Sequence, residues 1–487
     1  MGDILGQLDA LFQRFIVSPI DAVIFFDVAF WDNGTPGEIV APAVVVWLAI
    51  AALFFTLRFR FISLRGFKHG TEVVRGHYAR AEDKGEISPF QALSAALSAT
   101  VGLGNIAGVA TAVGLGGPGA VFWMVIAGML GMSSKFAEVT LAQMYRVTRA
   151  DGHISGGGMH YLRAGLAEIG WPRLGAVLAS VFAVMCIGAS FGGGNMYQAN
   201  QSFAQFANVV PAFAGTGGAV AFGLFLAVLV GLVIIGGIKR IGDVASVLVP
   251  VMCGIYLVAG FAILVLHASE IPAAFGTIVR GAFSPEAAFG GVVGVMIIGF
   301  RRAGFSNEAG CGSAPIAHSA ATQSEPVRQG LVALLEPFID TVIVCHMTGL
   351  VVVVTGAYTH PEAGSGIAMT SWAFNSIFPG FEYVLSLTAF LFAFSTMISW
   401  SYYGEQCWAH LFGVRSLLVY KLVFLLFTWA GAVFAAQAVL DFGDLMILGM
   451  AFPNLVGVVM LSGKIDAAAR DYFARLKAGA FARAKSS

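Results

Sequence analysis

Long apolar stretches recur along this chain, and they constrain its fold more than any other feature. An apolar run of about 20 residues is the length that a helix needs to cross the hydrocarbon core of a bilayer. Because backbone polar groups in hydrocarbon must bond within their own segment, each run is expected to be helical. The sequence therefore predicts an all-α polytopic membrane protein with about 11 transmembrane helices. The predicted spans are 39–57, 89–112, 118–145, 175–206, 217–237, 244–267, 289–318, 329–357, 382–410, 416–437 and 443–462.

The composition agrees with this class of protein. Hydrophobic residues make up 58% of the chain, charged residues make up 11%, and the formal net charge is zero. A chain without excess charge has no electrostatic reason to bind nucleic acid, whereas its apolar surface calls for membrane lipids as partners. The five cysteines lie in apolar stretches, where cysteine acts as a small hydrophobic residue, so we expect no disulfide framework.

Basic residues cluster in alternate connections and set the expected orientation. Most of them lie in the connections 58–86 and 146–173, in the turn at Lys239 and Arg240, and in the tail 464–487. The positive-inside rule makes these parts cytoplasmic, which leaves the N-terminus outside and the C-terminus inside. The expected organisation is a periplasmic or interfacial segment 1–37, one transmembrane domain 38–463, and a basic cytoplasmic tail 464–487.

The number of spans suggests an internal repeat. Without the first span, ten remain, and these divide into five plus five of opposite orientation, about 88–268 and 289–463. Two sets of five spans with opposite orientation are typical of an inverted-topology repeat. We find no sequence identity between the halves, so the prediction rests on topology.

The first span of each half carries an interruption. Residues 98–105 place two glycines and several small polar residues at mid-span, and residues 301–312 place three glycines and three charges there. Glycine disfavours a helix by about 1 kcal/mol relative to alanine, and an unwound turn in hydrocarbon leaves backbone groups unbonded. Such a break is favoured where it lines a polar cavity: half-helix N-termini suit a carboxylate, and freed carbonyls suit a small cation.

A structural alternative exists for the glycines. Gly104 and Gly108 also fit the small-xxx-small pattern of close helix packing. Two matched breaks, one beside Asn105 and one containing Ser306-Asn307-Glu308, favour the interrupted helices over simple packing.

Three segments carry a family resemblance. The segments from Gln91 to Gly128, from Gly299 to His318 and from Phe394 to Gln406 resemble the alanine/glycine:cation symporter family. The likeness runs from about residue 60 to 465, and the FSNEAG-x-GSAP stretch is its most specific part. The family is similar in fold to the bacterial leucine transporter. The resemblance implies a secondary active symporter of the bacterial inner membrane, which takes up a small neutral amino acid with sodium by alternating access.

The resemblance also implies a set of site residues, carried over motif by motif. The residues expected to bind substrate are Leu103, Gly104, Asn105, Gln198, Phe305, Ser306, Thr396 and Trp400. The expected sodium ligands are carbonyls of Ser98 and Val101 with hydroxyls of Ser395, Thr396 or Ser399, because sodium prefers oxygen ligands. Threonine is frequent in the family at the position of Leu103, so this residue is expected to affect selectivity. No cofactor is expected beyond sodium as the coupling ion.

Ionisable residues inside the predicted spans are candidates for function, because they are costly in a membrane. Glu138 is expected to brace the second break by accepting hydrogen bonds from the backbone near Gly304–Glu308. Arg301 and Arg302 lie towards the outer half of their span and could pair with Asp441 or Asp444 as an external gate. The alternative is a static local network that runs from Arg301 to Glu308.

An enzyme, a channel and a proton-coupled transporter are the alternatives to this interpretation. The chain has no GxxxxGK[ST], HExxH, CxxC or GxSxG motif and no long soluble loop, so an enzyme is not expected. A channel remains an alternative because broken helices also line pores. Coupling to protons, carried by Glu138 or Glu308, is the nearest alternative among transporters.

Overall fold

The structure is a computed structural model that describes residues 13–30, 40–80, 82–149, 152–284, 291–376, 379–434 and 436–481. Helices dominate it, and the one sheet of the described residues is a short hairpin of β1 (Val147–Thr148) and β2 (Ile154–Ser155). Parts of the predicted N-terminal segment (1–12 and 31–39) and the last six residues of the tail (482–487) lie outside the described residues. The rest of the chain is mostly helical, as predicted for a membrane protein, and differs from the all-α prediction at this hairpin.

Eight helical segments of the described chain are long and apolar enough to cross a membrane, or nine when one bent pair is counted as a span. The eight are Gly119–Met144, Pro172–Val209, Thr216–Ile234, Gly237–Leu266, Pro326–Val354, Phe381–Phe412, Val414–Val433 and Val439–Met460. The bent pair is Pro89–Thr100 with Gly104–Gly116. Two further predicted spans coincide with shorter helices, α3 (Ala43–Arg58) and α15 (Gly291–Asn307). The count of 11 and the inverted repeat therefore remain predictions.

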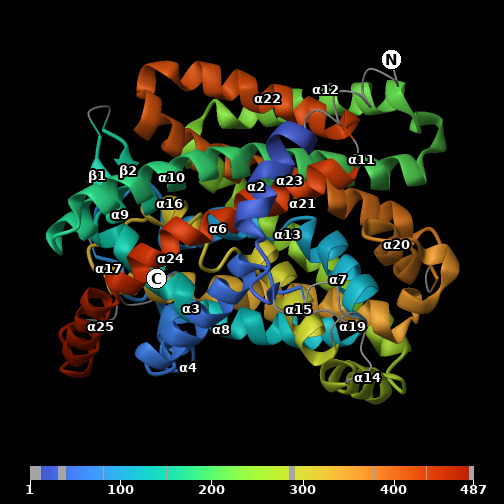
Figure 1. Ribbon diagram of the computed structural model, residues 1–487, viewed down its shortest axis with the longest axis horizontal. Coiled ribbons are helices and arrows are strands. Elements are labelled where there is room, and N and C mark those ends of the chain that lie inside the picture. Colours follow the sequence, from blue (N-terminus) through green and yellow to red (C-terminus); the bar gives the residue numbers. More distant parts are fainter. Residues whose placement is uncertain are drawn as a thin grey trace.

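These segments contain the long helices of the structure, and shorter helices complete, connect or cover them. The long ones are α8 (Gly119–Met144), α10 (Pro172–Phe191), α11 (Tyr197–Val209), α12 (Thr216–Ile234), α13 (Gly237–Leu266), α21 (Phe381–Phe412), α22 (Leu417–Val433), α23 (Ala436–Gly449) and α24 (Ala451–Met460). The shorter ones include α9 (Gly158–Glu168), α14 (Ile271–Phe283), α17 (Pro326–Ala333), α19 (His346–Val354), α20 (Ile367–Asn375) and α25 (Ser462–Lys477). The hairpin, α9, α17 and α25 gather at one end of the molecule, and α20 lies at the other (Figure 1).

The first interruption lies where the sequence predicts it. Helix α6 (Pro89–Thr100) begins at a capping box in which Ser88 and Gln91 bond each other's backbone amides. It ends before Val101, and the chain resumes as a π-helical turn η3 (Gly104–Gly108) that continues into α7 (Val109–Gly116). The two halves are bent by 52°.

The second interruption is shorter than predicted. Helix α15 continues through Asn307, so residues 301–307 are helical and only 308–313 separate it from α16 (Ala314–His318). Positive φ angles begin at Glu308 (54°) and recur at Gly310 (98°) and Gly312 (84°). A positive φ is uncommon outside glycine and is often stored at functional sites. The change of backbone direction therefore starts at Glu308, three residues beyond the Gly304-Phe305 pair.

Three further segments are π-helical, which the sequence did not predict. They are η1 (Gln13–Val17), near the N-terminus, η4 (Gly192–Met196), between α10 and α11, and η6 (Phe338–Cys345), before α19. A Cβ atom on Gly194 would stand 2.2 Å from Cγ of Trp400, so only glycine allows η4 to approach α21 this closely. Such π segments occur often at functional sites.

The surface and interior divide as expected for a membrane protein. Large apolar side chains such as Leu224, Val228 and Val258 are exposed on α12 and α13, where lipid chains would cover them. Polar and charged side chains such as Lys135 and Glu336 are fully buried instead. All five cysteines are buried and free.

The C-terminal segment packs onto the same end of the molecule as the hairpin. The Phe481 ring lies 5.0 to 5.3 Å from the guanidinium carbons of Arg80, Arg328 and Arg475. It also stacks on Tyr472, with ring centroids 4.9 Å apart. Helix α25 and Phe481 thereby hold together the segment before α6 and the start of α17.

Candidate functional site

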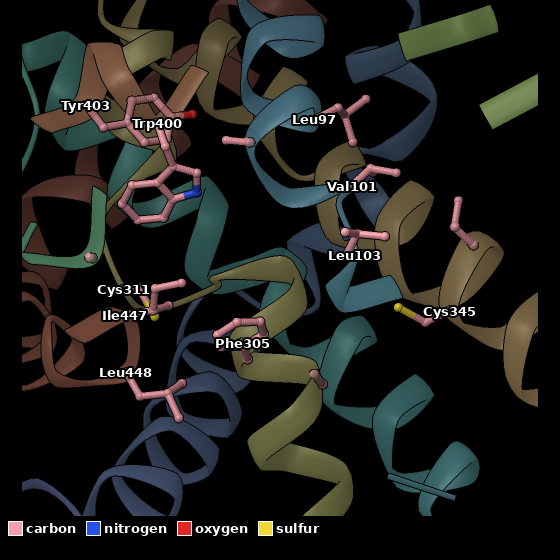
Figure 2. Packing of buried hydrophobic residues seen from close by; sticks show 14 of the residues in the cluster. Leu97, Val101, Leu103, Phe305, Cys311, Cys345, Trp400, Tyr403, Ile447 and Leu448 are labelled. Carbon is pink, nitrogen blue, oxygen red and sulfur yellow. The ribbon is translucent and has the colours of Figure 1, made fainter. Parts of the chain in front are cut away.

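A small enclosed cavity lies where the two interruptions meet. A Cβ atom on Gly104 would stand 3.5 Å from the Phe305 ring and 3.7 Å from the Cα atom of Ser306, so the two broken helices are in contact. The space is hardly wider than a water molecule, so a solute must move side chains as it enters. The lining residues are Ala99, Thr100, Gly104, Gly193, Gln198, Phe305, Ser306, Glu308, Trp400 and Ile447. Figure 2 shows Trp400, Ile447 and Phe305 around this region.

The backbone amides at the first break differ in their partners. The Gly102 amide donates to the Thr100 carbonyl and to Oδ1 of Asn105, and the Leu103 amide donates to Oε1 of Gln198 at 3.1 Å. Gly104 is the first residue of η3, where helix N–H groups lack partners within their own helix, and it borders the cavity. Of the two residues Leu103 and Gly104, only Gly104 therefore presents its backbone to the cavity.

Five of the eight expected substrate residues border the cavity: Gly104, Gln198, Phe305, Ser306 and Trp400. The other three do not, although all three are buried: Leu103, Asn105 and Thr396. Figure 2 shows the Leu103 side chain set apart from Trp400, on the side of Cys345. Asn105 acts inside the protein, because its Nδ2 atom donates to Oδ1 of Asp340 at 2.6 Å.

An aromatic pair separates the cavity from a wide vestibule. The rings of Tyr197 and Phe305 meet edge to face with centroids 5.4 Å apart. Phe305 lines the cavity, and Tyr197 lines the vestibule together with Gln201, Arg301 and Asp441. The vestibule opens at the end of the molecule that carries α20.

The two arginines of α15 pair as one of the sequence-based alternatives expects. Nε and Nη2 of Arg301 donate to Oδ2 of Asp444 at 3.1 and 2.8 Å, and Nη1 of Arg302 donates to Oδ1 at 3.2 Å. The guanidinium of Arg301 also lies over the Phe25 ring at 4.5 Å. The Asp444 side chain is 1% exposed, so both arginines compensate one buried carboxylate at the base of the vestibule.

Uncommitted oxygens gather on the other side of the first break. The Gly102 and Leu103 amides bond elsewhere, so the Ser98 and Ala99 carbonyls lose the partners that a continuous helix would give them. The hydroxyls of Thr396 and Ser399 are buried and have no hydrogen-bond partner among the described residues. A Cβ atom on Gly102 would stand 2.5 Å from Oγ1 of Thr396, which places this hydroxyl against the break.

The remaining expected sodium ligands have different roles. The Ser395 hydroxyl donates to the carbonyl of Phe392 in its own helix at 3.0 Å. The Ser98 hydroxyl donates to the Ser395 carbonyl at 2.6 Å and so ties α6 to α21. The Val101 carbonyl has no helical partner, since the Asn105 amide donates to Gly102 instead. Orphaned hydroxyls and freed carbonyls form a donor set that fits a hard cation.

A buried carboxylate that the sequence analysis missed connects the two breaks. Asp340 in η6 accepts hydrogen bonds from Asn105 at 2.6 Å, from Ser306 at 3.0 Å and from Thr341 at 2.7 Å. It is fully buried, and no basic side chain of the described residues lies within 4 Å of it. An aspartate inside an apolar span is itself a sequence signal for function, and Asp340 lies inside the predicted span 329–357.

More buried charges surround the second break. Nζ of Lys135 donates to Oε1 of Glu336 at 3.3 Å, and both side chains are fully buried. Glu138 accepts from Nδ2 of Asn454 at 2.5 Å, and the same nitrogen donates to the carbonyl of Gly310 at 2.8 Å. The described hydrogen bonds thus connect Glu138 to the break through Asn454 at Gly310, rather than directly to the backbone near Gly304–Glu308 as expected.

These features define a class of protein. Interrupted helices that meet around a small polar cavity in the middle of an apolar helical body are the architecture of a secondary transporter. The family model described as the sodium:alanine symporter family matches residues 33–486. The chain belongs to this family, which makes it a multi-pass membrane transporter and not an enzyme.

Relatives and a solved structure agree with the assignment. The chain is 39% identical over 429 residues to the sodium/alanine symporter AgcS of Methanococcus maripaludis, which covers 87% of this chain and 92% of that one. It is 36% identical over 459 residues to the putative sodium/proton-dependent alanine carrier protein YrbD of Bacillus subtilis, with 90% and 91% covered. The structure of MhsT in complex with L-phenylalanine matches with a TM-score of 0.53 at 14% identity, over 78% of this chain and 99% of that chain. This last likeness shows the leucine-transporter type of fold.

Proposed function

We propose that this protein is a sodium-coupled symporter that takes up a small neutral amino acid by alternating access. The observation that carries the proposal is the small cavity at the meeting point of two broken helices, with Gly104 at the start of η3 in its wall. The N-terminus of a half-helix suits the carboxylate of an amino acid. The rings of Phe305 and Trp400 line the cavity and favour a ligand with a small side chain.

Two oxygen-rich places next to the cavity support coupling to sodium. The first combines the freed carbonyls of Ser98 and Val101 with the orphaned hydroxyls of Thr396 and Ser399. The second is the Asp340 carboxylate, which supplies the negative charge that the first lacks. Because each place touches the first break, cation binding there would fix the backbone conformation that presents the Gly104 amide.

Alternating access is supported by the difference between the two ends of the cavity. On the vestibule side, the Tyr197–Phe305 pair lies between the cavity and the vestibule, and Arg301 and Arg302 with Asp444 form the proposed external gate. On the opposite side several layers of contacts close the protein. Nε2 of Gln91 donates to Oδ1 of Asp243 at 2.8 Å, and the Ile154 amide donates to Glu86 at 2.6 Å.

The proposal extends to topology. The positions of the vestibule and the basic connections favour an N-terminus outside and a C-terminus inside the bacterial inner membrane, with 11 spans arranged as one plus five plus five. In this arrangement Arg301 and Asp444 face the outside, and Gln91 and Asp243 face the cytoplasm.

Uptake by proteoliposomes tests the function. Labelled L-alanine should accumulate against its gradient when sodium is high outside and the proton gradient is zero. Exchange of internal unlabelled alanine for external label should also occur, because a carrier alternates between sides. Flux that neither saturates nor accumulates would instead indicate a channel.

Proton coupling is the second candidate. Glu138, Glu308 and Glu336 are three buried carboxylates that have Lys135 as the nearest buried ammonium, and one relative is named as sodium/proton-dependent. Accumulation driven by an imposed proton gradient in sodium-free solution would support this candidate and contradict the sodium coupling.

A further inference from the structure

The carboxylate of Glu308 forms part of the wall of the central cavity. Glu308 is 2% exposed and is the first residue of the second break, with a φ of 54°. Its Oε1 atom accepts a hydrogen bond from Nε1 of Trp400 at 3.2 Å, and its Oε2 atom accepts one from the hydroxyl of Ser313. Both partners hold the carboxylate in place beside the cavity.

These two bonds leave acceptor capacity on the carboxylate. An ionised carboxylate has about four lone-pair sites on its two oxygens, and the described protein occupies two. Among the described residues, no basic side chain lies within 4 Å of Glu308. Lys135 is near enough to act on it electrostatically, but its ammonium donates to Glu336 instead. A cationic group in the cavity could therefore bind Glu308 without displacing a protein partner.

The cavity is polar at two different places, and the two have opposite character. Gly104 brings the N-terminal end of η3 to the cavity, where helix N–H groups lack partners within their own helix, and Glu308 is an acceptor with spare capacity. No lysine, arginine or histidine lines the cavity. A zwitterion of the size of alanine matches this pattern, because its carboxylate and ammonium groups are separated by one carbon atom.

We infer that Glu308 binds the ammonium group of the substrate and thereby orients it, with the substrate carboxylate at the Gly104 amide. The inference rests on the proposed function and specifies its ligand: a primary α-amino acid is accepted, and the corresponding α-hydroxy acid is rejected. Rejection follows because a hydroxyl leaves the buried carboxylate without its counter-charge.

A purely structural role makes a different prediction. If Glu308 only holds Trp400 and Ser313, its removal should weaken every ligand by the same factor, because all of them meet the same deformed wall. A role in binding the ammonium group changes the ratio between ligands that differ at this group alone. The ratio between L-alanine and L-lactate is such a measurement.

The test is competition against labelled L-alanine with the purified full chain in sodium-containing buffer. The wild-type protein should prefer L-alanine over L-lactate by at least about 30-fold, the lower range for a buried charge pair. Glu308→Gln keeps the size of the side chain and an oxygen for Trp400, and should lower the preference below about 3-fold through loss of alanine affinity. Glu405→Gln removes a carboxylate of α21 that pairs with Lys421 and does not line the cavity, and should keep the wild-type ratio.

Other possible results of this experiment would contradict either the inference or the proposed function. An unchanged ratio in Glu308→Gln, or an equal loss in Glu405→Gln, would overturn the inference while leaving the proposed symport intact. If wild-type protein binds no amino acid, the proposed function itself fails. If Glu308→Gln does not yield folded protein, Glu308→Asp is used: it retains the charge, so alanine should bind more weakly but still be preferred over lactate, and a lost preference would contradict the inference.

Discussion

At the scale of single residues, the most informative atoms are polar ones without a partner. A buried hydroxyl left unbonded costs about 1–3 kcal/mol, yet Thr396 and Ser399 both carry such a hydroxyl against the first break. The neighbouring Ser395 hydroxyl bonds its own helix, as membrane serines commonly do. The difference between these neighbours separates a candidate ligand from a structural hydroxyl.

Thr396→Val provides a test because it replaces the hydroxyl by a methyl group of similar size. If Thr396 binds the cation, the variant should need about 10-fold more sodium for half-maximal alanine binding, while its melting temperature in sodium-free buffer stays equal or rises. Ser395→Ala is the matched control and should leave the sodium dependence unchanged. Equal sodium curves for Thr396→Val and wild type would remove Thr396 from the proposed site.

Asp340 makes a second prediction at this scale. Asp340→Asn keeps the shape of the side chain but removes the buried negative charge that Asn105 and Ser306 surround. Sodium should then no longer raise the melting temperature of the purified protein, whereas wild type should gain several degrees at saturating sodium. Thr341→Val removes one donor to the same carboxylate and should retain most of the sodium effect. A full sodium effect in Asp340→Asn would show that this charge does not bind the ion.

At the scale of elements, the breaks depend on contacts that only glycine permits. Gly102 lies in the unwound part of the first break, where a Cβ atom would stand 2.5 Å from Thr396 and 3.0 Å from Gln198. Gly108 lies six residues further on in the same interrupted helix and has nothing within 4 Å of its Cβ position. One glycine therefore shapes the site, and the other does not.

Gly102→Ala should destabilise the protein by about 1–3 kcal/mol, the usual cost of overpacking, and should weaken alanine binding by displacing Gln198 from the Leu103 amide. Gly108→Ala should be neutral or stabilising by about 0.5–1 kcal/mol, since alanine favours a helix over glycine. Thermal unfolding in detergent and alanine binding measure both effects. If the two variants behave alike, the first break is not held by close contact at Gly102.

At the scale of the whole molecule, the two broken helices are joined to each other at the end that lies away from the vestibule. The segment before α6 pairs with the segment after α16, where the Glu86 amide donates to the Ala320 carbonyl and the Thr322 amide donates to Ile87. Arg146 at the end of α8 donates to backbone carbonyls on both sides, including Lys84 at 2.8 Å and Ala321 at 2.7 Å. The C-terminal segment then covers this junction with Phe481.

Phe481→Ala should lower stability by about 2 kcal/mol, because three cation–π contacts of about 0.5–1 kcal/mol each are lost. Phe481→Tyr retains an aromatic face and should keep most of the stability. A melting curve of the purified protein distinguishes the variants. An unchanged melting temperature for Phe481→Ala would show that the tail contributes nothing to the closed junction.

The sequence predicted what depends on local composition. The length of the apolar stretches located the helices, and the clustered glycines located the first break. The charged residues within the predicted spans indicated Asp441 or Asp444 as the partner of Arg301. Which amide finds which acceptor depends on distant packing: the Leu103 amide is satisfied by Gln198, 95 residues away. Sequence periodicity does not reveal such long-range packing. It therefore could not predict that the Leu103 side chain lies away from the cavity, that η4 and η6 are π-helical, or that the Asp340 carboxylate lies between the breaks.

Because its five cysteines are buried, the native chain should react very little with thiol reagents. Since all five are shielded, a membrane-impermeant maleimide should react chiefly with a cysteine that is introduced deliberately, for example at the exposed Ala368 in the vestibule. Cys311 lies inside the second break and is fully buried, so a maleimide can reach it only when the helices around the break separate. Its labelling rate would therefore measure how often the break becomes exposed to solvent, without an introduced cysteine.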